Sequence, residues 1–203
     1  MSGNLFIISA PSGAGKTSLV SALLKNTDQI DLSISYTTRQ PRPGDINGKD
    51  YHFVSRDEFL TMKENGDFLE WAEVYGNFYG TSRHWIGQEI AKGRDILLEI
   101  DWQGAQQVRQ LFPDSIHIFI LPPSLTALAS RLAARNQDSE EIIATRLQAA
   151  REDISHVSEF DYVIINDKLE VALQQLIAIV TATSLQGKKQ LARQATLIQQ
   201  LQH

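Results

Sequence analysis

The residues best suited to chemistry lie near the start of the chain, between an apolar run and a helical pattern. Leu5 to Ile8 favour a strand, and the residues after Thr17 place apolar side chains on one helix face. In this context the backbone N–H groups of the loop form an anion cavity, and the helix N-terminus adds partial positive charge. The loop predicted to bind a nucleoside triphosphate comprises Ala10, Pro11, Ser12, Gly13, Ala14, Gly15, Lys16 and Thr17.

Four residues of this loop have specific roles in that interpretation. Gly13 and Gly15 allow positive φ angles and a close approach of the backbone to phosphate. Lys16 supplies a charge for the β- and γ-phosphates, and the Thr17 hydroxyl can ligate Mg²⁺. The usual pattern is G-x-x-x-x-G-K-[ST], and its first position is Ala10 here. The alternative is a glycine-containing turn with an incidental lysine, which the flanking strand and helix argue against.

The composition limits the classes of protein to be considered. The chain has 203 residues, 42% of them hydrophobic, which is enough for one sizeable core. The net charge of −5 argues against non-specific nucleic-acid binding, because no overall basic field attracts phosphates. The absence of cysteine excludes disulfides and cysteine-ligated zinc. No apolar stretch approaches the ~18 residues of a membrane span, so we expect a soluble cytoplasmic protein with no membrane or nucleic-acid partner.

Strand and helix patterns alternate along most of the chain, which predicts a parallel sheet with right-handed crossovers. The expected core strands are residues 5–9, 30–35, 96–101, 116–121 and 162–165. Residues from about 30 to 82 differ, since they contain short strands and turns with Pro41, Pro43 and Gly44 among them. We therefore expect an α/β core that carries an inserted small lobe.

Seven motifs, in order along about residues 4 to 183, resemble those of guanylate kinases. They are Ala10 to Thr17, Ser35 to Arg42, Gly48 to Tyr51, Phe68 to Ala72, Tyr79 to Thr81, Ile100 to Gly104, and Asn166-Asp167. In that family Ala at the first position of the phosphate loop is normal. The resemblance implies transfer of the γ-phosphoryl group of ATP to GMP, with Mg²⁺ accompanying ATP.

The resemblance also implies a division of the chain into three parts. A P-loop kinase core with a parallel sheet and helices on both faces is expected in residues 1–34, 83–123 and 158–203. A small mixed β lobe for the acceptor nucleotide is expected in residues 35–82, and a helical lid in residues 124–157.

The acceptor site of the family maps onto residues that are present here. The resemblance implies a GMP site whose phosphate ligands are Arg39, Arg42, Tyr51 and Tyr79, and whose base-reading residues are Ser35, Glu70 and Thr81. Guanine presents adjacent N1–H and N2–H₂ donors, which a carboxylate accepts, whereas adenine has no N1–H. Singly, such arginines could be ordinary ion-pair partners and such tyrosines core aromatics. The prediction rests on their joint order beside the phosphate loop.

Two acids at the end of the strand 96–101 are candidates for magnesium. Acids in this place bind Mg²⁺ or its waters. The family more often has Asp at the position of Glu99. We favour Asp101 for a contact with magnesium or with GMP, and keep Glu99 as the alternative.

Three arginines follow in the predicted lid. Arg131 and Arg135 share one helix face, and Arg146 lies on the next helix. They could be solvated, but the resemblance places them over the triphosphate; it also places Asn166 near the adenine of ATP, and Asn136 replaces a common glycine. The residues expected to act in catalysis are Lys16, Arg39, Arg131, Arg135 and Arg146.

Three alternative functions are open at the level of sequence. A regulatory GTPase is favoured by the D-x-x-G pattern of Asp101 to Gly104 but lacks an N-K-x-D motif. A non-catalytic interaction module of guanylate-kinase type would lose loop residues, whereas Lys16 and Thr17 are kept. A kinase for another nucleoside monophosphate is disfavoured by Glu70. The leucines beyond residue 184 could pack on a partner, such as a second copy, or on the chain's own core, which leaves a homo-oligomer open.

Overall fold

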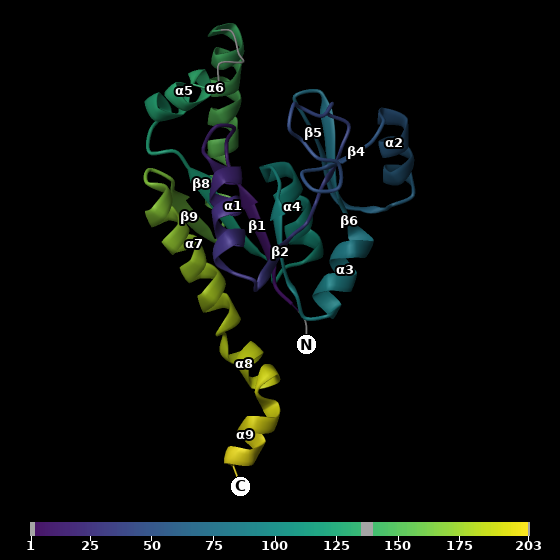
Figure 1. The fold of residues 1–203 in the computed structure, drawn as a ribbon, viewed down its shortest axis with the longest axis vertical. Coiled ribbons are helices and arrows are strands. Elements are labelled where there is room, and N and C mark those ends of the chain that lie inside the picture. Colours follow the sequence, from purple (N-terminus) through teal and green to yellow (C-terminus); the bar gives the residue numbers. More distant parts are fainter. Residues whose placement is uncertain (1–2, 135–139, 203) are drawn as a thin grey trace.

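A five-stranded parallel sheet forms the centre of the protein (Figure 1). The computed structural model describes residues 3–134 and 140–202. The order of the strands is β2-β7-β1-β8-β9. Their bounds are β1 Leu5–Ser9, β2 Ile30–Leu32, β7 Asp95–Glu99, β8 Ile116–Leu121 and β9 Tyr162–Ile165. The predicted parallel sheet is therefore confirmed.

Helices cover both faces of this sheet because β1 alternates its apolar side chains. Phe6 and Ile8 pack in a cluster with residues of two helices, α1 (Lys16–Asn26) and α7 (Leu169–Ser184). Leu5 and Ile7 pack in a second cluster with residues of α3 (Arg83–Ala91) and α4 (Trp102–Leu111). The period of two along a strand thus produces the three-layered core.

A smaller mixed sheet interrupts the core between β2 and α3. Its order is β4-β3-β6-β5, with β3 parallel to β4 and both remaining pairs antiparallel. The strands are β3 Tyr36–Thr37, β4 His52–Phe53, β5 Phe68–Val74 and β6 Asn77–Ser82. Together with α2 (Arg56–Glu64) they enclose a separate cluster around Phe59, Phe68 and Phe78. We call the segment from β3 to β6, including α2, the acceptor lobe. The boundaries predicted for it, residues 35–82, stay a prediction.

The strand predicted over residues 30–35 was too long. Strand β2 ends at Leu32, and the next strand, β3, begins only at Tyr36 and belongs to the acceptor lobe. Ser33 still donates its backbone N–H to the Leu97 carbonyl at 3.0 Å, and the chain then leaves the core sheet. Continuous β propensity conceals such a crossing, because one extended segment can serve two sheets.

Two further helices stand above the carboxyl ends of the core strands (Figure 1). They are α5 (Leu125–Ala133) and α6 (Glu140–Ser155), which pack through Leu128, Leu132 and Ala150. A short 3-10 helix at Val157–Glu159 leads back to β9. These helices occupy the predicted lid, whose boundaries also stay a prediction.

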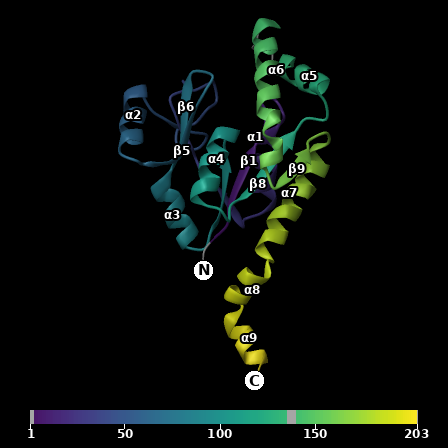
Figure 2. The same cartoon turned by 180° about the vertical axis from the view of Figure 1, so that it is seen from behind.

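The C-terminal helices project away from the core at the opposite end (Figure 2). They are α8 (Gly187–Arg193) and α9 (Ala195–Leu201), and the chain bends by 60° between α7 and α8. Within residues 3–134 and 140–202, no single helix is long and apolar enough to cross a membrane. The bent pair α7 and α8 meets the length and composition limits only when taken together.

Candidate active site

A cavity of about 510 Å³ opens at the carboxyl ends of β1 and β7, between the core, the acceptor lobe and α6. Many of the residues predicted for the site line it. They are Ala10, Pro11, Ser12, Gly13, Gly15, Lys16, Thr17, Ser35, Arg42, Tyr51, Glu70, Tyr79, Glu99, Asp101 and Arg146. Ends of parallel strands meet here, so residues far apart in sequence converge on one space.

The loop after β1 has the backbone that phosphate binding requires. Gly13 and Gly15 have φ angles of 89° and 90°, as predicted. Gly15 is the N-cap of α1, so the helix begins at Lys16 and its N-terminus faces the cavity. A side chain at Gly15 would also collide with Asn166, because an ideal Cβ would lie 2.4 Å from Nδ2.

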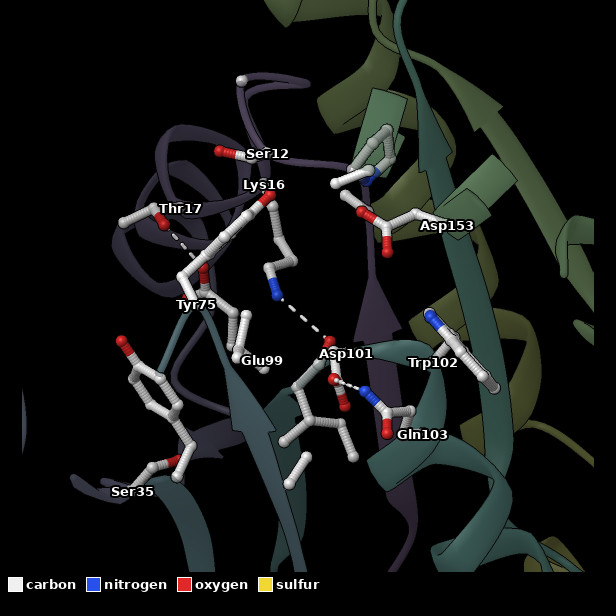
Figure 3. A pocket seen from close by; sticks show the side chains of 18 of the residues that line it. Ser12, Lys16, Thr17, Ser35, Tyr75, Glu99, Asp101, Trp102, Gln103 and Asp153 are labelled. Atoms are coloured by element: carbon white, nitrogen blue, oxygen red, sulfur yellow. Dashed lines mark hydrogen bonds between the residues drawn. The ribbon is translucent and has the colours of Figure 1, made fainter. Parts of the chain in front are cut away.

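Lys16 and Thr17 reach from this loop to the end of β7. Figure 3 shows Lys16 in the middle of the cavity, where Nζ donates to the Ile100 carbonyl at 3.1 Å. The Thr17 hydroxyl donates to Glu99 Oε1 at 2.5 Å. A hydroxyl and a carboxylate therefore stand side by side at the phosphate loop.

Asp101, favoured from sequence over Glu99, has a different set of contacts. Its carboxylate caps α4 by accepting the Gly104 N–H at 2.9 Å, and it also accepts from Gln103 Nε2 at 3.2 Å. Asp101 still lines the cavity. The acid beside the Thr17 hydroxyl is Glu99, and the choice between the two acids for magnesium stays a prediction.

Glu70 is a buried carboxylate on β5, with 3% of its surface exposed. Thr81 on the neighbouring strand donates its hydroxyl to Glu70 Oε1 at 2.5 Å. Burial raises the pKa of Glu70 to about 7, with a further rise from the Asp101 carboxylate and opposing effects of the Thr81 hydrogen bond and the Lys16 charge. The Thr81 hydroxyl donates its hydrogen bond to Glu70 here, so its predicted contact with the base stays a prediction.

Positive side chains of two parts of the molecule line a second hollow of about 500 Å³ beside the main cavity. Arg39 and Arg42 belong to the acceptor lobe, whereas Arg146 belongs to α6. Arg39 pairs with Asp45 at 2.9 Å and lies over the Tyr51 ring, 5.2 Å from its centroid. Burial raises the pKa of Tyr51 to about 12, so its hydroxyl keeps its proton. An anionic group between the lobe and α6 would face these three guanidinium groups.

Two of the predicted site residues, Asn166 and Arg131, bind the phosphate loop through the Ala14 carbonyl. Asn166, 6% exposed, donates from Nδ2 to the Ala14 carbonyl at 2.8 Å. Arg131 donates to the Asn166 carbonyl at 2.9 Å and to the Ala14 carbonyl at 3.4 Å. Arg135 and Asn136, predicted for the lid, lie outside the described residues.

The sequence interpretation missed several residues that line the cavity. Asp153 on α6 faces Lys16 (Figure 3), and burial, followed by the Asp101 charge, raises its pKa to about 6. Trp102 also lines the cavity and stacks on His156, with ring centroids 3.5 Å apart. Tyr75 adopts a φ of 50° in the turn between β5 and β6. Nothing in the sequence marks one acid of an amphipathic helix, such as Asp153, as a cavity residue. Trp102 does stand in one of the motifs of the family resemblance, but the sequence interpretation gave it no role.

The comparison with known protein families decides the family. The model of the guanylate kinase family matches residues 2–193. The chain belongs to the guanylate kinase family. The predicted resemblance is thereby confirmed over nearly the whole chain.

Curated relatives and solved structures agree with this membership. The guanylate kinase of Dechloromonas aromatica is 58% identical over 99% of this chain and 100% of that protein, and the one of Thiobacillus denitrificans is 60% identical over 96% and 93%. A crystal structure of guanylate kinase from Anaplasma phagocytophilum has a TM-score of 0.78 and 36% identity, over 92% of this chain and 88% of that one. A shikimate kinase from Bacteroides thetaiotaomicron, 14% identical with a TM-score of 0.50 over 88% and 98%, shares the fold alone.

Proposed function

We propose that this chain transfers the γ-phosphoryl group of ATP to GMP, giving ADP and GDP. Membership in the guanylate kinase family supports this reaction. The structural observation that carries it is one cavity lined by both the phosphate loop and the buried carboxylate of Glu70. A donor nucleotide and a guanine base would thus occupy the two ends of a single space.

The donor subsite would lie at the phosphate loop. The backbone of residues 10–15 and the N-terminus of α1 would bind phosphate oxygens. Lys16 would move from the Ile100 carbonyl, which it contacts at 3.1 Å, to the β- and γ-phosphates, because an anionic acceptor binds an ammonium group more strongly than a neutral carbonyl does. Asn166 would act mainly by holding Ala14, with the adenine of ATP nearby.

The acceptor subsite would lie in the lobe of residues 35–82. Arg39, Arg42, Tyr51 and Tyr79 would bind the 5′-phosphate of GMP. Ser35 and Glu70 would face the base, and Thr81 would orient Glu70 through the bond of 2.5 Å. Adenine lacks an N1–H and would leave the buried carboxylate with Thr81 as its donor but none from the base, which costs about 1–3 kcal/mol or more for a charged group.

The proposed transfer needs no general base. The nucleophile is a phosphate oxygen of GMP, which is largely ionised at pH 7 because the second pKa of such a phosphate is about 6. Catalysis then consists of positioning and charge neutralisation by Lys16 and the arginines. Arg146, which lines both hollows, is well placed to meet the phosphoryl group between the two nucleotides.

The donor set at the loop suits Mg²⁺ carried by ATP. Mg²⁺ prefers oxygen ligands, keeps several waters and takes one or two carboxylates plus substrate phosphates. Thr17 and Glu99 supply one hydroxyl and one carboxylate, with Asp101 close behind, and no cluster of three or more His, Asp or Glu able to hold a metal occurs in the described part of the chain. Bound there, Mg²⁺ would neutralise phosphate charge; Thr17 and Glu99 would orient it.

The test is the substitution Glu70→Gln, which replaces one acceptor oxygen by an N–H₂ facing a guanine donor. We expect the kcat/KM for GMP to fall roughly 10- to 100-fold or more, since hydrogen bonds to charged groups are worth about 1.5–3 kcal/mol. ATP affinity, measured separately, should barely change. Glu64→Gln, an exposed residue of α2 outside the cavity, is the matched control. An unchanged efficiency with GMP would contradict the proposed acceptor site.

Two further proposals concern the surroundings of the enzyme. We propose a cytoplasmic location, which the lack of cysteine supports through compatibility with a reducing compartment. The exposed leucines at the end of α7 and on the C-terminal helices, Leu185, Leu191, Leu197 and Leu201, would suit an assembly of identical chains. The oligomeric state of the protein can be measured by light scattering.

A further inference from the structure

Strand β5 joins the acceptor lobe to the core through side chains that point in opposite directions. Phe68 and Trp71 pack in the aromatic cluster of the lobe, whereas Leu69 packs in the core cluster with residues of α3 and α4. Phe68 pairs with Ser82 and Glu70 pairs with Thr81, so Leu69 is an extra residue on β5. This bulge turns Leu69 and Glu70 together toward the core. Glu70 therefore lies against α4 instead of inside the lobe.

The side chain of Gln107 on α4 bonds to the edge of β5 at Trp71, the residue after Glu70. Gln107 Nε2 donates to the Trp71 carbonyl at 2.8 Å, and the Trp71 N–H donates to Gln107 Oε1 at 3.2 Å. Strand β5 is the last strand of its sheet, so the Gln107 amide takes the place of a neighbouring strand. Both backbone groups of Trp71 are thereby paired on that side, and the residue after Glu70 is fixed to the core.

Gly104, one turn earlier on α4, provides the space for the carboxylate itself. Residues three apart share a helix face, so Gly104 and Gln107 both face β5. An ideal Cβ at Gly104 would lie 2.5 Å from Glu70 Oε2 and 3.2 Å from its Cδ. One carboxylate oxygen thus accepts from Thr81 while the other lies against the bare backbone of α4. Asp101 fixes this turn through the Gly104 N–H.

We propose that Gln107 and Gly104 are positioning residues that set Glu70 for guanine discrimination. The inference rests on the proposed function and adds residues to which that function assigned no role. Accepting N1–H and N2–H₂ together requires a carboxylate held in one orientation, because misplacement by about 1 Å loses both bonds at once. Core helix α4, rather than the lobe alone, supplies that orientation.

The first test uses Gln107→Met, which keeps the length of the side chain and removes both hydrogen bonds. Steady-state kinetics are measured with GMP and with IMP, whose base lacks the 2-amino group. We expect the KM for GMP to rise about tenfold, as loss of about 1.4 kcal/mol implies. The GMP-to-IMP ratio of kcat/KM should fall, while the KM for ATP changes less than about twofold.

Gln106→Met is the matched control on the same helix. Gln106 is exposed and donates to Glu159 at 2.8 Å, away from the acceptor lobe. A general loss of structure would lower the efficiencies with GMP and IMP equally and leave their ratio unchanged. That equal loss, or wild-type kinetics in Gln107→Met, would overturn the assignment of Gln107.

The second test is a double-mutant cycle on thermal stability that needs no activity. Gly104→Ala should lower the Tm of the wild type, because the methyl group collides with Glu70. In a Glu70→Ala background the collision with Glu70 is gone, and the same substitution should lower the Tm much less, because the methyl group then meets only Ile100 Cδ1 at 3.3 Å and alanine favours helix over glycine. Equal effects in both backgrounds would overturn the role of Gly104. A wild type that does not phosphorylate GMP would instead refute the proposed function and leave this cycle intact.

Discussion

Glu70 shows how a single residue acquires its chemistry from burial. A solvated glutamate ionises with an ordinary pKa of 4.5, whereas burial raises the pKa of Glu70 to about 7. The folded state therefore holds this proton more tightly than the unfolded chain does. The stabilising contribution of the group is full below pH of about 4.5 and is lost as the pH rises through about 7.

The same pKa predicts a pH dependence of GMP binding. Guanine donors need the ionised carboxylate, so the KM for GMP should rise up to about tenfold per pH unit below 7 and level off above it. The groups facing Glu70 are the Thr81 hydroxyl, the Asp101 carboxylate and the Lys16 ammonium. Kinetics between pH 5.5 and 8.5 (about three units, a range that brackets the shifted value) provide the measurement.

Glu70→Gln separates this effect from ionisation of the GMP phosphate. The variant keeps the phosphate limb near pH 6 and should lose the limb near pH 7. Identical pH profiles for the wild type and Glu70→Gln would show that Glu70 does not titrate in contact with the base.

Lys16 is the second residue whose replacement gives a clear expectation. Lys16→Met should lower kcat by at least about 10²–10³-fold, because a preorganised charge at the phosphates is lost. The circular dichroism spectrum should stay that of the wild type, since Nζ lies in the cavity and not in the core. Lys25→Met, an exposed position at the end of the same helix, is the control. Near-normal turnover in Lys16→Met would contradict the donor subsite.

At the scale of elements, local signals explain what the sequence could predict. Serine before an amphipathic run is one such signal, and Ser55, Ser82 and Ser124 accept N–H groups at the starts of α2, α3 and α5. The residues of the phosphate loop could be recognised in the sequence because contact with phosphate fixes their spacing. The bulge at Leu69 and the Gln107 bonds could not be recognised, since they depend on α4 meeting β5 across 36 residues of sequence.

The choice between Glu99 and Asp101 is a different case, because a local signal bears on it. Both stand at the end of one buried strand, and alternation alone does not say which carboxylate turns toward Thr17. Asp101 caps α4, whereas Glu99 accepts from the Thr17 hydroxyl, and the choice between them for magnesium stays a prediction. A helix start immediately after an aspartate was visible in the sequence and could have favoured Glu99.

Helix α6 carries the prediction that concerns the lid. Arg146→Ala should lower kcat by a factor on the order of 10³ while changing the KM for GMP much less, as arginines that neutralise a transferring phosphoryl group do. Arg151→Ala, exposed on the same helix and outside both hollows, is the control. A rise in the KM for GMP alone would assign Arg146 to acceptor binding instead of the transition state.

At the scale of the whole molecule, three bodies meet at the main cavity and the second hollow beside it. The core supplies the phosphate loop, the acceptor lobe supplies Glu70 and two arginines, and α6 supplies Arg146. The sequence predicted a core, a lobe and a lid from the change in strand length and from the family resemblance, and the boundaries of these parts stay a prediction. It did not predict the extended C-terminal helices, whose Lys189 reaches back to Asn4 at the start of β1. Closure of the three bodies around two nucleotides would exclude water from the transfer.

The most direct test of the central claim is a coupled assay of ADP release against a panel of nucleoside monophosphates. With ATP and Mg²⁺ present, the account predicts rapid ADP release with GMP, slow release with AMP, CMP and UMP, and almost none without an acceptor. The product should be GDP, identified by chromatography. Nucleotide hydrolysis that proceeds equally without GMP, or a preference for another monophosphate, would contradict it.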